Sequence, residues 1–306
     1  SDTEWLSADG TTSPVGYFLA SNPSRLIAAI KKIFAEAAKP AGNLAGGSVN
    51  VGKVNAATTV GGFYQAQINP SDFSGTVVRT KLTFNTLTQS LEVGSIPVWD
   101  AANILTGVQT NTTTLSPFPL PANRKILSYS STSLQGVTFS WSTVDAAVQT
   151  SLSTDPVTSV NEGTTAGQAR LDYIRGVRTG ETDGTDFRAR RLIMGDVINS
   201  AAVLKGAPSS CIVDSGYATF YNTYKARTPT LYVGANDGML HAFRAADDAT
   251  VSTNGQELFA YVPRAVSHKL NKLTDPAYTK EAYVDGSLVV TEANFYRPTQ
   301  SAVAWG

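Results

Sequence analysis

The stretch LYVGANDGMLHAFRA, residues 231–245, limits the possible folds of this chain more than any other. Two runs rich in β-forming residues flank Asp237 and Gly238. Asp-Gly between such runs is typical of a two-residue type I′ turn, in which both turn residues have positive φ. Because a two-stranded hairpin cannot bury its apolar face alone, other strands of the chain must pack against this one.

The two glycines of this hairpin are expected to play different roles. Gly238 adopts positive φ without strain, whereas a β-branched residue in its place is strained. Gly234 lies inside the first strand, where an added methyl group should be tolerated better. We therefore expect Gly238→Val to destabilise the hairpin more than Gly234→Ala does.

Alternation of polar and apolar residues with period two recurs from about residue 49 onward and predicts further antiparallel strands. The predicted strands or strand pairs occupy residues 61–82, 123–130, 135–141, 190–206, 255–263 and 281–295. The last of these is a second hairpin, with its turn at Asp285-Gly286. Residues 95–105 predict a strand that runs into a short helical turn. Residues 166–176 and 264–273 instead predict short helices.

Short antiparallel strands with frequent turn signals favour a sandwich, a barrel or a propeller. The order strand, Asp-Gly turn, strand, glycine-led turn, strand spans residues 231–263, and a similar unit begins near residue 283. Antiparallel units that repeat at about 40 to 50 residues are typical of a β-propeller. We therefore predict an all-β, partial β-propeller of antiparallel four-stranded blades, in which the hairpin 231–245 stacks on a neighbouring blade.

Residues 22–38 predict the clearest helix in the chain. Asn22 suits the N-cap and Pro23 the first helical position. An apolar stripe follows at helical spacing, formed by Leu26, Ile30, Ile33, Phe34 and Ala37. Since the residues that follow are typical of a linker, we expect the helix to belong to a unit that precedes the propeller.

Composition argues against several classes of function. The chain has 24 Lys and Arg against 24 Asp and Glu, so no basic surface for nucleic acid or anionic membrane is expected. No run of about 18 apolar residues is present, and we expect no membrane span. No signal peptide is visible at Ser1, which is also what a processed piece of a longer protein would show.

Residue types that bind metals or perform catalysis are scarce. Cys211 is the only cysteine, which excludes an intrachain disulfide and a cysteine-based metal site. A buried free thiol is the simpler interpretation of Cys211, and a reactive or intermolecular thiol is the alternative. We interpret His241 as a packing residue in a strand and His268 as a solvated residue on a short helix, although the sequence leaves a Ser-His-Asp triad open.

Other conspicuous side chains have structural interpretations. Trp99, Trp141 and Trp305 are interpreted as packing residues, with a sugar-binding aromatic surface as the alternative. Asp237 is interpreted as a turn residue and not as an acid or base. Asp196 is expected to accept main-chain hydrogen bonds at a strand edge. The sequence therefore predicts no catalytic, cofactor-binding or metal-binding residue.

Five stretches of the chain follow one another in an order that is known from a bacterial family. They are GYFLASNPSRLIAAIKKI, RRLIMGDVINSAAVLKG, LYVGANDGMLHAF, GQELFAYVPRAV and LTDPAYTKEAYVDGS. In these stretches the chain resembles the PilY/PilC family of type IV pilus tip-associated proteins. The resemblance extends from about residue 17 to residue 295 and is most specific between Arg190 and Gly286.

The resemblance implies a division into two parts. Residues 1–42 would be the tail of a von Willebrand factor A-like domain with its last helix, and residues 43–306 the first blades of a quinoprotein-like propeller. The DxSxS-type adhesion motif and the acidic calcium loop of the family are both absent from the sequence. The acidic runs ETDGTDF and AADDAT lack calcium-loop spacing, so we expect no cofactor in this segment and place any calcium in other parts of a full-length protein.

By the same resemblance, the chain is expected to be a non-enzymatic pilus-tip protein that supports type IV pilus assembly and surface adhesion. Its propeller would dock to minor pilins and face a host or abiotic surface, outside the cell after export through the periplasm. The alternative is a quinone-dependent dehydrogenase. Leu258 and Phe259 stand where such an enzyme would carry a docking tryptophan, and one cysteine cannot form its vicinal pair. A purely structural connector in a filament cap is a third interpretation.

Overall fold

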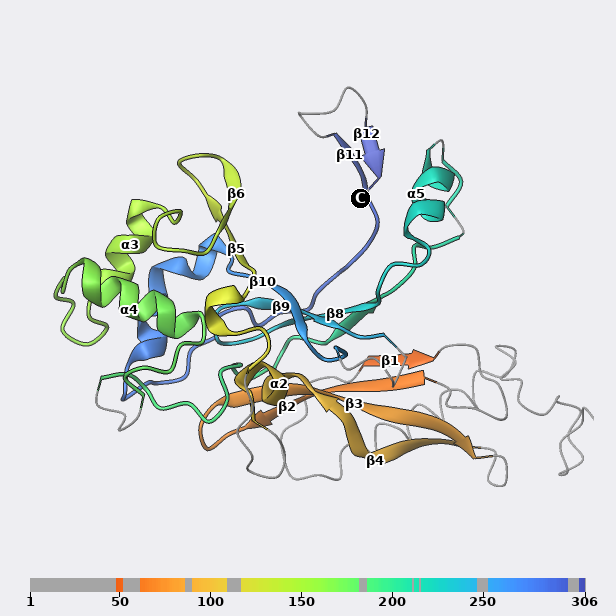
Figure 1. The fold of residues 1–306 in the computed structure, drawn as a ribbon, viewed down its shortest axis with the longest axis horizontal. Helices are drawn as coiled ribbons and strands as arrows, with labels where there is room; N and C mark the ends of the chain where they lie inside the picture. Colours follow the sequence, from red (N-terminus) through yellow and green to blue (C-terminus); the bar gives the residue numbers. More distant parts are fainter. Residues whose placement is uncertain are drawn as a thin grey trace, which may run out of the picture.

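The computed structural model describes residues 48–51, 61–85, 90–108, 117–181, 186–210, 212–214, 216–246, 253–296 and 303–305. Within these ranges the regular structure is mostly β, with short helices between the strands (Figure 1). None of the helices described there has the length and apolar character that a bilayer crossing requires. The predicted helix 22–38, the boundary between residues 42 and 43, and Cys211 lie outside the described residues.

The first sheet is an antiparallel meander with the strand order β1-β2-β3-β4. Its strands are β1 (Ser48–Val51), β2 (Gly61–Asn69), β3 (Ser74–Asn85) and β4 (Ser90–Asp100). The carboxylate of Asp72 accepts the N–H of Ser74 and so closes the turn between β2 and β3. Asp100 ends β4 and caps the helix α2 (Ala101–Thr106), as the strand-to-helix pattern at 95–105 predicts.

The second sheet has the strand order β6-β5-β10-β9-β8-β7. Its strands are β5 (Ile126–Ser130), β6 (Gln135–Thr138), β7 (Val203–Lys205), β8 (Thr230–Gly234), β9 (Leu240–Arg244) and β10 (Glu257–Tyr261). Strands β7 to β10 are antiparallel neighbours, as predicted, but β5 joins β10 in parallel. The sheet is therefore wider than the predicted four-stranded unit, because β5 and β6 extend it.

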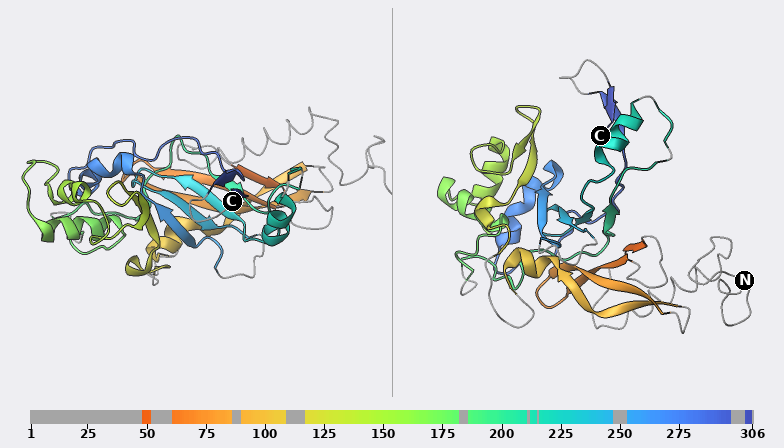
Figure 2. Two further views of the ribbon diagram at one scale, coloured as in Figure 1. Left: turned by 90° about the horizontal axis from the view of Figure 1, so that it is seen from above. Right: turned by 45° about the vertical axis from the view of Figure 1, so that its right-hand side comes forward.

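Two apolar cores hold these elements together. The first lies between the two sheets, where Tyr64, Trp99 and Met194 pack with Leu231 and Phe243 of the β8–β9 hairpin. The second packs three helices against β5 and β10, namely α3 (Ala146–Ser153), α4 (Thr164–Ile174) and the 3-10 helix η3 (Arg264–Thr274). The short 3-10 helix η2 (Pro121–Asn123) precedes β5 and has no buried residue. The two sheets lie one over the other, and α3, α4 and η3 gather at one end (Figure 2).

Residues 192–197 cross between the two sheets and do not form the strand that the sequence predicts in the range 190–206. On one side, the carbonyl of Met194 accepts the N–H of Gly75 at the start of β3, and the N–H of Asp196 donates to the carbonyl of Phe73 in the β2–β3 turn. The carbonyl of Asp196 accepts the N–H of Asn236, in the β8–β9 turn, on the other side. Only β7, at the end of the predicted range, is a strand, because the crossing segment divides its main-chain bonds between two turns.

Glycines make this crossing sterically possible. A Cβ atom at Gly195 would lie 2.4 Å from the main-chain nitrogen of Asp237. A Cβ atom at Gly75 would lie 2.4 Å from the carbonyl oxygen of Gly195. Both neighbours are main-chain atoms that cannot rotate away, so three layers of backbone contact one another directly.

The hairpin in residues 231–245 is present, but its turn is longer than predicted. Gly234 pairs with Leu240, and the N–H of Ala235 donates to the carbonyl of Met239 at 2.9 Å. The turn is therefore formed by residues 236–238, of which only Gly238 has positive φ, at 92°. The type I′ prediction was wrong, because a three-residue turn needs a left-handed residue only at its last position.

The predicted hairpin at residues 281–295 does not form. Residues 281–293 contain no strand, and β11 (Asn294–Tyr296) pairs instead with β12 (Val303–Trp305). The carboxylate of Asp285 accepts the main-chain N–H of Asn199 at 2.8 Å, which ties the expected turn residue to another segment. The Asp-Gly pair at 285–286 is therefore a tether between segments and not a turn.

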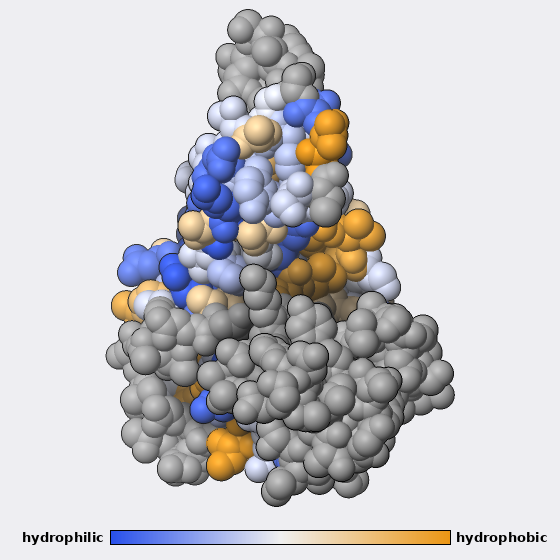
Figure 3. Space-filling view, turned by 90° about the vertical axis from the view of Figure 1, so that its right-hand side faces the viewer, coloured by the Kyte–Doolittle hydropathy of each residue, from blue (hydrophilic) through white to orange (hydrophobic). Residues whose placement is uncertain are grey.

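An arm formed by α5 (Tyr217–Tyr224) and the β11–β12 hairpin stands out from the two sheets (Figure 1). Its contacts are aromatic, with the rings of Tyr217 and Trp305 at 4.7 Å between centroids. The Trp305 indole N–H donates to Asp214. The side of the molecule that carries this arm shows apolar patches beside hydrophilic ones (Figure 3).

The glycine contacts generate a stability prediction. A Cβ at Gly234 would lie 2.5 Å from the carbonyl oxygen of Val284, so the expectation that Gly234→Ala is mild conflicts with the structure. Gly238 combines its positive φ with a 2.6 Å approach to Leu270 Cδ2. We expect Gly238→Val to cost about 1–3 kcal/mol of unfolding free energy, and Gly234→Ala to be of the same order.

Urea unfolding would measure both losses. Gly286→Ala is the matched control, because a Cβ at Gly286 meets no atom within 4 Å. If Gly234→Ala unfolded at the same urea concentration as Gly286→Ala, the close backbone contact at Gly234 would be refuted.

Candidate functional site

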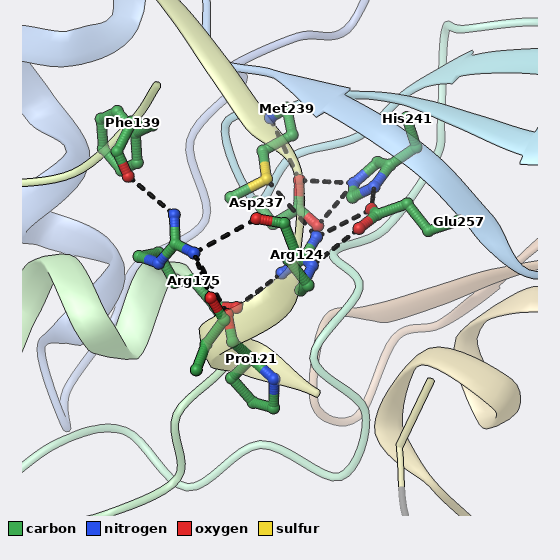
Figure 4. Close-up of polar contacts among 9 residues, drawn as sticks. Pro121, Arg124, Phe139, Arg175, Asp237, Met239, His241 and Glu257 are labelled. Atoms are coloured by element: carbon green, nitrogen blue, oxygen red, sulfur yellow. Dashed lines mark hydrogen bonds and ion pairs between the residues drawn. The ribbon is translucent and has the colours of Figure 1, made fainter. Parts of the chain in front are cut away.

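Four charged side chains form a cluster where the second sheet meets α4 (Figure 4). Arg124, His241 and Glu257 are buried, and the Asp237 side chain is 13% exposed. Arg124, just before β5, donates two hydrogen bonds to the Glu257 carboxylate, at 2.7 and 2.8 Å. His241 of β9 contacts Glu257 through Nδ1 at 2.8 Å and Asp237 through Nε2 at 3.0 Å. Two cations thus alternate with two anions, and the paired, hydrogen-bonded arrangement offsets the cost of burying the charges.

Asp237 connects the cluster to the crossing segment. Its Oδ2 atom accepts the N–H of Gly195 at 2.9 Å, and its Oδ1 atom accepts the N–H of Met239 at 3.1 Å. One carboxylate therefore fixes its own turn, the crossing residues and the ring of His241.

Arg175, next to the C-terminal end of α4, extends the network with main-chain contacts. Arg124 and Arg175 each donate to the other's carbonyl oxygen, at 2.9 and 3.2 Å. Arg175 also donates to the carbonyls of Phe139 and Pro121 (Figure 4). The end of α4 is thereby joined to η2, to the start of β5 and to the residue that follows β6.

The neighbouring charges set the protonation states of the cluster. Burial would lower the pKa of His241, but the charge of Asp237 and the hydrogen bonds to Asp237 and Glu257 outweigh it and raise the pKa to about 9. Burial would raise the pKa of Glu257, but the charge and hydrogen bonds of Arg124 outweigh it and lower the pKa to about 2. At neutral pH the cluster therefore holds two positive and two negative charges.

This geometry suits a structural role better than catalysis. Both ring nitrogens of His241 face carboxylates, and its side chain is 1% exposed. A general base needs a free nitrogen within reach of a substrate proton. The Ser-His-Asp arrangement left open by the sequence is thus not found at His241, whose two nitrogens both bind acidic residues.

The remaining conspicuous residues lie apart from the cluster. Trp99 is buried and packs against Tyr64 at 5.8 Å between ring centroids, and Trp141 packs on the second core, in agreement with their interpretation as packing residues. His268 is exposed on η3. Asp196 is 2% exposed, and its carboxylate pairs with the Lys280 ammonium and not with the main-chain donors expected for it.

Among the described residues, no group of three or more His, Cys, Asp and Glu side chains is placed to hold a metal ion. The acidic runs ETDGTDF and AADDAT lie only partly within the described ranges.

Little in the sequence pointed to the cluster. The interpretation of His241 as a packing residue was incomplete, because its ring is paired with two carboxylates. A four-residue spacing between Asp237 and His241 around a turn was a usable signal. Arg124 and Glu257 are 133 residues apart, and no local pattern connects them.

Removal of one charge should show how much the cluster contributes to the free energy of unfolding. Glu257→Gln leaves Arg124 buried without its carboxylate partner and leaves His241 with Asp237 alone, and we expect it to cost about 3–5 kcal/mol. Glu281→Gln is the matched control, because the ion pair between Glu281 and Lys272 is partly exposed and should be worth less than about 1 kcal/mol. Equal chemical denaturation midpoints for the two variants would contradict the ion-pair chain.

The same pairs predict how stability depends on pH. The pKa of His241 is raised from 6.5 to about 9, so its contribution is present below pH 6.5 and is lost as the pH rises to 9. The pKa of Glu257 is lowered from 4.5 to about 2, so its contribution is present above pH 4.5 and is lost as the pH falls. The unfolding free energy should drop by on the order of 3 kcal/mol between pH 6.5 and 9.

Denaturation curves at several pH values would test this profile. His241→Gln should flatten the alkaline drop, whereas His268→Gln, at an exposed position, should keep it. If the unfolding free energy of His241→Gln still fell between pH 6.5 and 9 as in the unchanged protein, groups other than His241 would be responsible for the fall.

Comparison with known proteins places this fold in a family. Residues 194–306 match the family model of the PilY1 beta-propeller domain. The chain is 32% identical over 296 residues to the type IV pilus biogenesis factor PilY1 of Pseudomonas aeruginosa strain PAK, an alignment that covers 91% of this chain and 23% of that protein. A PilY1 homolog of Xylella fastidiosa is 41% identical over 140 residues, or 43% of this chain and 11% of that protein.

No solved structure matches the chain. The chain spans less than a quarter of the length of the Pseudomonas aeruginosa relatives that it matches. The similarity nevertheless runs through nearly all of its residues and includes the stretches that carry the crossing segment and the β8–β9 hairpin. The chain therefore belongs to the PilY1/PilC family.

Proposed function

We propose that this chain is part of a non-enzymatic protein of the type IV pilus tip, which supports pilus assembly and surface adhesion. The observation that carries the proposal is the similarity of 91% of the chain to proteins named type IV pilus biogenesis factors. In this proposal a propeller acts as a rigid scaffold that docks to minor pilins and meets a host or abiotic surface.

The architecture supports a scaffold of propeller blades. The meander β1–β4 and the meander β7–β10 stack through one apolar core, as neighbouring blades do. We assign both to the first blades of a propeller in residues 43–306. Residues 1–42 are proposed to be the tail of a von Willebrand factor A-like domain.

The closed charge cluster supports the non-enzymatic part of the proposal. Its charged groups pair with one another and with main-chain groups, so they stiffen the second sheet and present no reactive atom to solvent. Residues Leu258 and Phe259, which replace the tryptophan of a quinone enzyme, lie in β10, where Phe259 packs edge-on against Tyr232. We propose that this segment acts without a quinone or a metal cofactor.

Pilus assembly in the bacterium that encodes the protein would test the function. The gene is deleted and restored with the unchanged sequence, with Gly195→Val, or with Gly136→Ala. Gly195→Val forces a side chain into the backbone crossing, so we expect few pilins in the sheared surface fraction and normal pilin levels in whole cells. Gly136→Ala should restore surface pili, because its Cβ would meet only the carbonyl oxygen of Ser128, at 3.9 Å.

Two outcomes would count against the proposal. A deletion strain with unchanged surface pili and unchanged adhesion would remove the assigned role. Reduction of a redox dye by the purified protein with added quinone would favour the dehydrogenase instead.

A further inference from the structure

Residues 286–292 form an extended segment that lacks main-chain partners. Among the described residues, no main-chain group between residues 279 and 293 bonds to another main-chain group. Side chains make the contacts instead, as where Tyr283 N–H donates to the Asn236 side chain. Buried main-chain groups of folded proteins are normally paired. Since Leu288, Val290 and Glu292 are half-buried, this unpaired run needs an explanation.

The segment has the properties of a β-strand without its ladder. Its burial alternates with period two, because Leu288 and Val290 are half-buried while Ser287 and Thr291 are exposed. Val289, at the centre, is 90% exposed. The β-branched residues at 289–291 favour extended backbone, and the alternation is that of a strand with one face on the protein.

Both ends of the segment are fixed. At one end, Asp285 accepts hydrogen bonds from the main chain and the side chain of Asn199, at 2.8 and 2.9 Å. At the other end, Glu292 pairs with Lys205 and Arg227, each at 2.8 Å, and its side chain is only 4% exposed. A segment held in this way has already lost most of its conformational freedom, so binding a further strand requires little additional ordering.

We propose that residues 286–292 are an open strand edge that accepts a β-strand from the rest of the propeller, outside this chain. The inference rests on the propeller in the proposed function. Two observations favour this occupant. The PilY1 beta-propeller model covers the segment, and the chain spans only 23% of its relatives, whose remaining length has room for further strands. The separate β11–β12 sheet also follows directly along the chain.

Hydrogen–deuterium exchange with peptide mass spectrometry would test the proposal. It compares this chain with a longer chain that continues through the rest of the propeller. We expect the amides of residues 287–291 to exchange rapidly in this chain, and about 100-fold or more slowly in the longer one. Rapid exchange in both chains would overturn the proposal, and so would protection in this chain that rises with its concentration, which would identify a second copy as the occupant.

Proline variants would add a test of the hydrogen bonds themselves. Along an edge strand, alternate N–H groups point to the added strand. Of Val289→Pro and Val290→Pro, one should therefore abolish the slow exchange in the longer chain and the other should largely keep it. Val289→Thr, which retains the N–H, is the control, and equal effects of both prolines would contradict strand addition. Because no pilus is measured, failure here is distinct from failure of the pilus function.

Discussion

The contact on which most of this structure depends is the carboxylate of Asp237. It accepts main-chain hydrogen bonds from Gly195 and Met239, and it holds the ring of His241. Through His241 it reaches Glu257 and then Arg124, so the turn, the crossing segment and the start of β5 share one chain of charges. Removal of one member of such a chain destabilises the fold, because it takes a partner from a charge in the interior.

The backbone crossing and the charge cluster serve the same purpose by different means. The crossing brings main chains into direct contact where Gly75 and Gly195 leave no side chain between them. The cluster then supplies the electrostatic attraction that keeps the turn over the crossing. Neither feature offers a reactive group to solvent, and together they make a stiff unit of two stacked sheets.

Local patterns predicted the local elements well. The alternation at 61–82 and 255–263 predicted β2, β3 and β10, and the predicted helix that ends at Gly176 matches α4. These elements depend on the spacing of apolar residues and on the turn residues that bound them. The failures at 190–206 and 281–295 have different causes, although both segments have strand-like sequences. In the first, main-chain groups of the crossing segment bond to two other parts of the chain, whereas in the second the described main-chain groups before β11 have no main-chain partner. Arg124 and Glu257 were missed because long-range pairing leaves no periodic signal.

The parallel pairing of β5 with β10 has a consequence for how the chain folds. Arg124 and Glu257 are separated by 133 residues, so β5 has no neighbour on that side until β10 is available. The second core, with α3 and α4, cannot close before then. Contacts of such long range close slowly because a large loop must first be ordered. During synthesis from the N-terminus, the segment between β5 and β10 therefore remains an incomplete core, at risk of aggregation until β10 has been made.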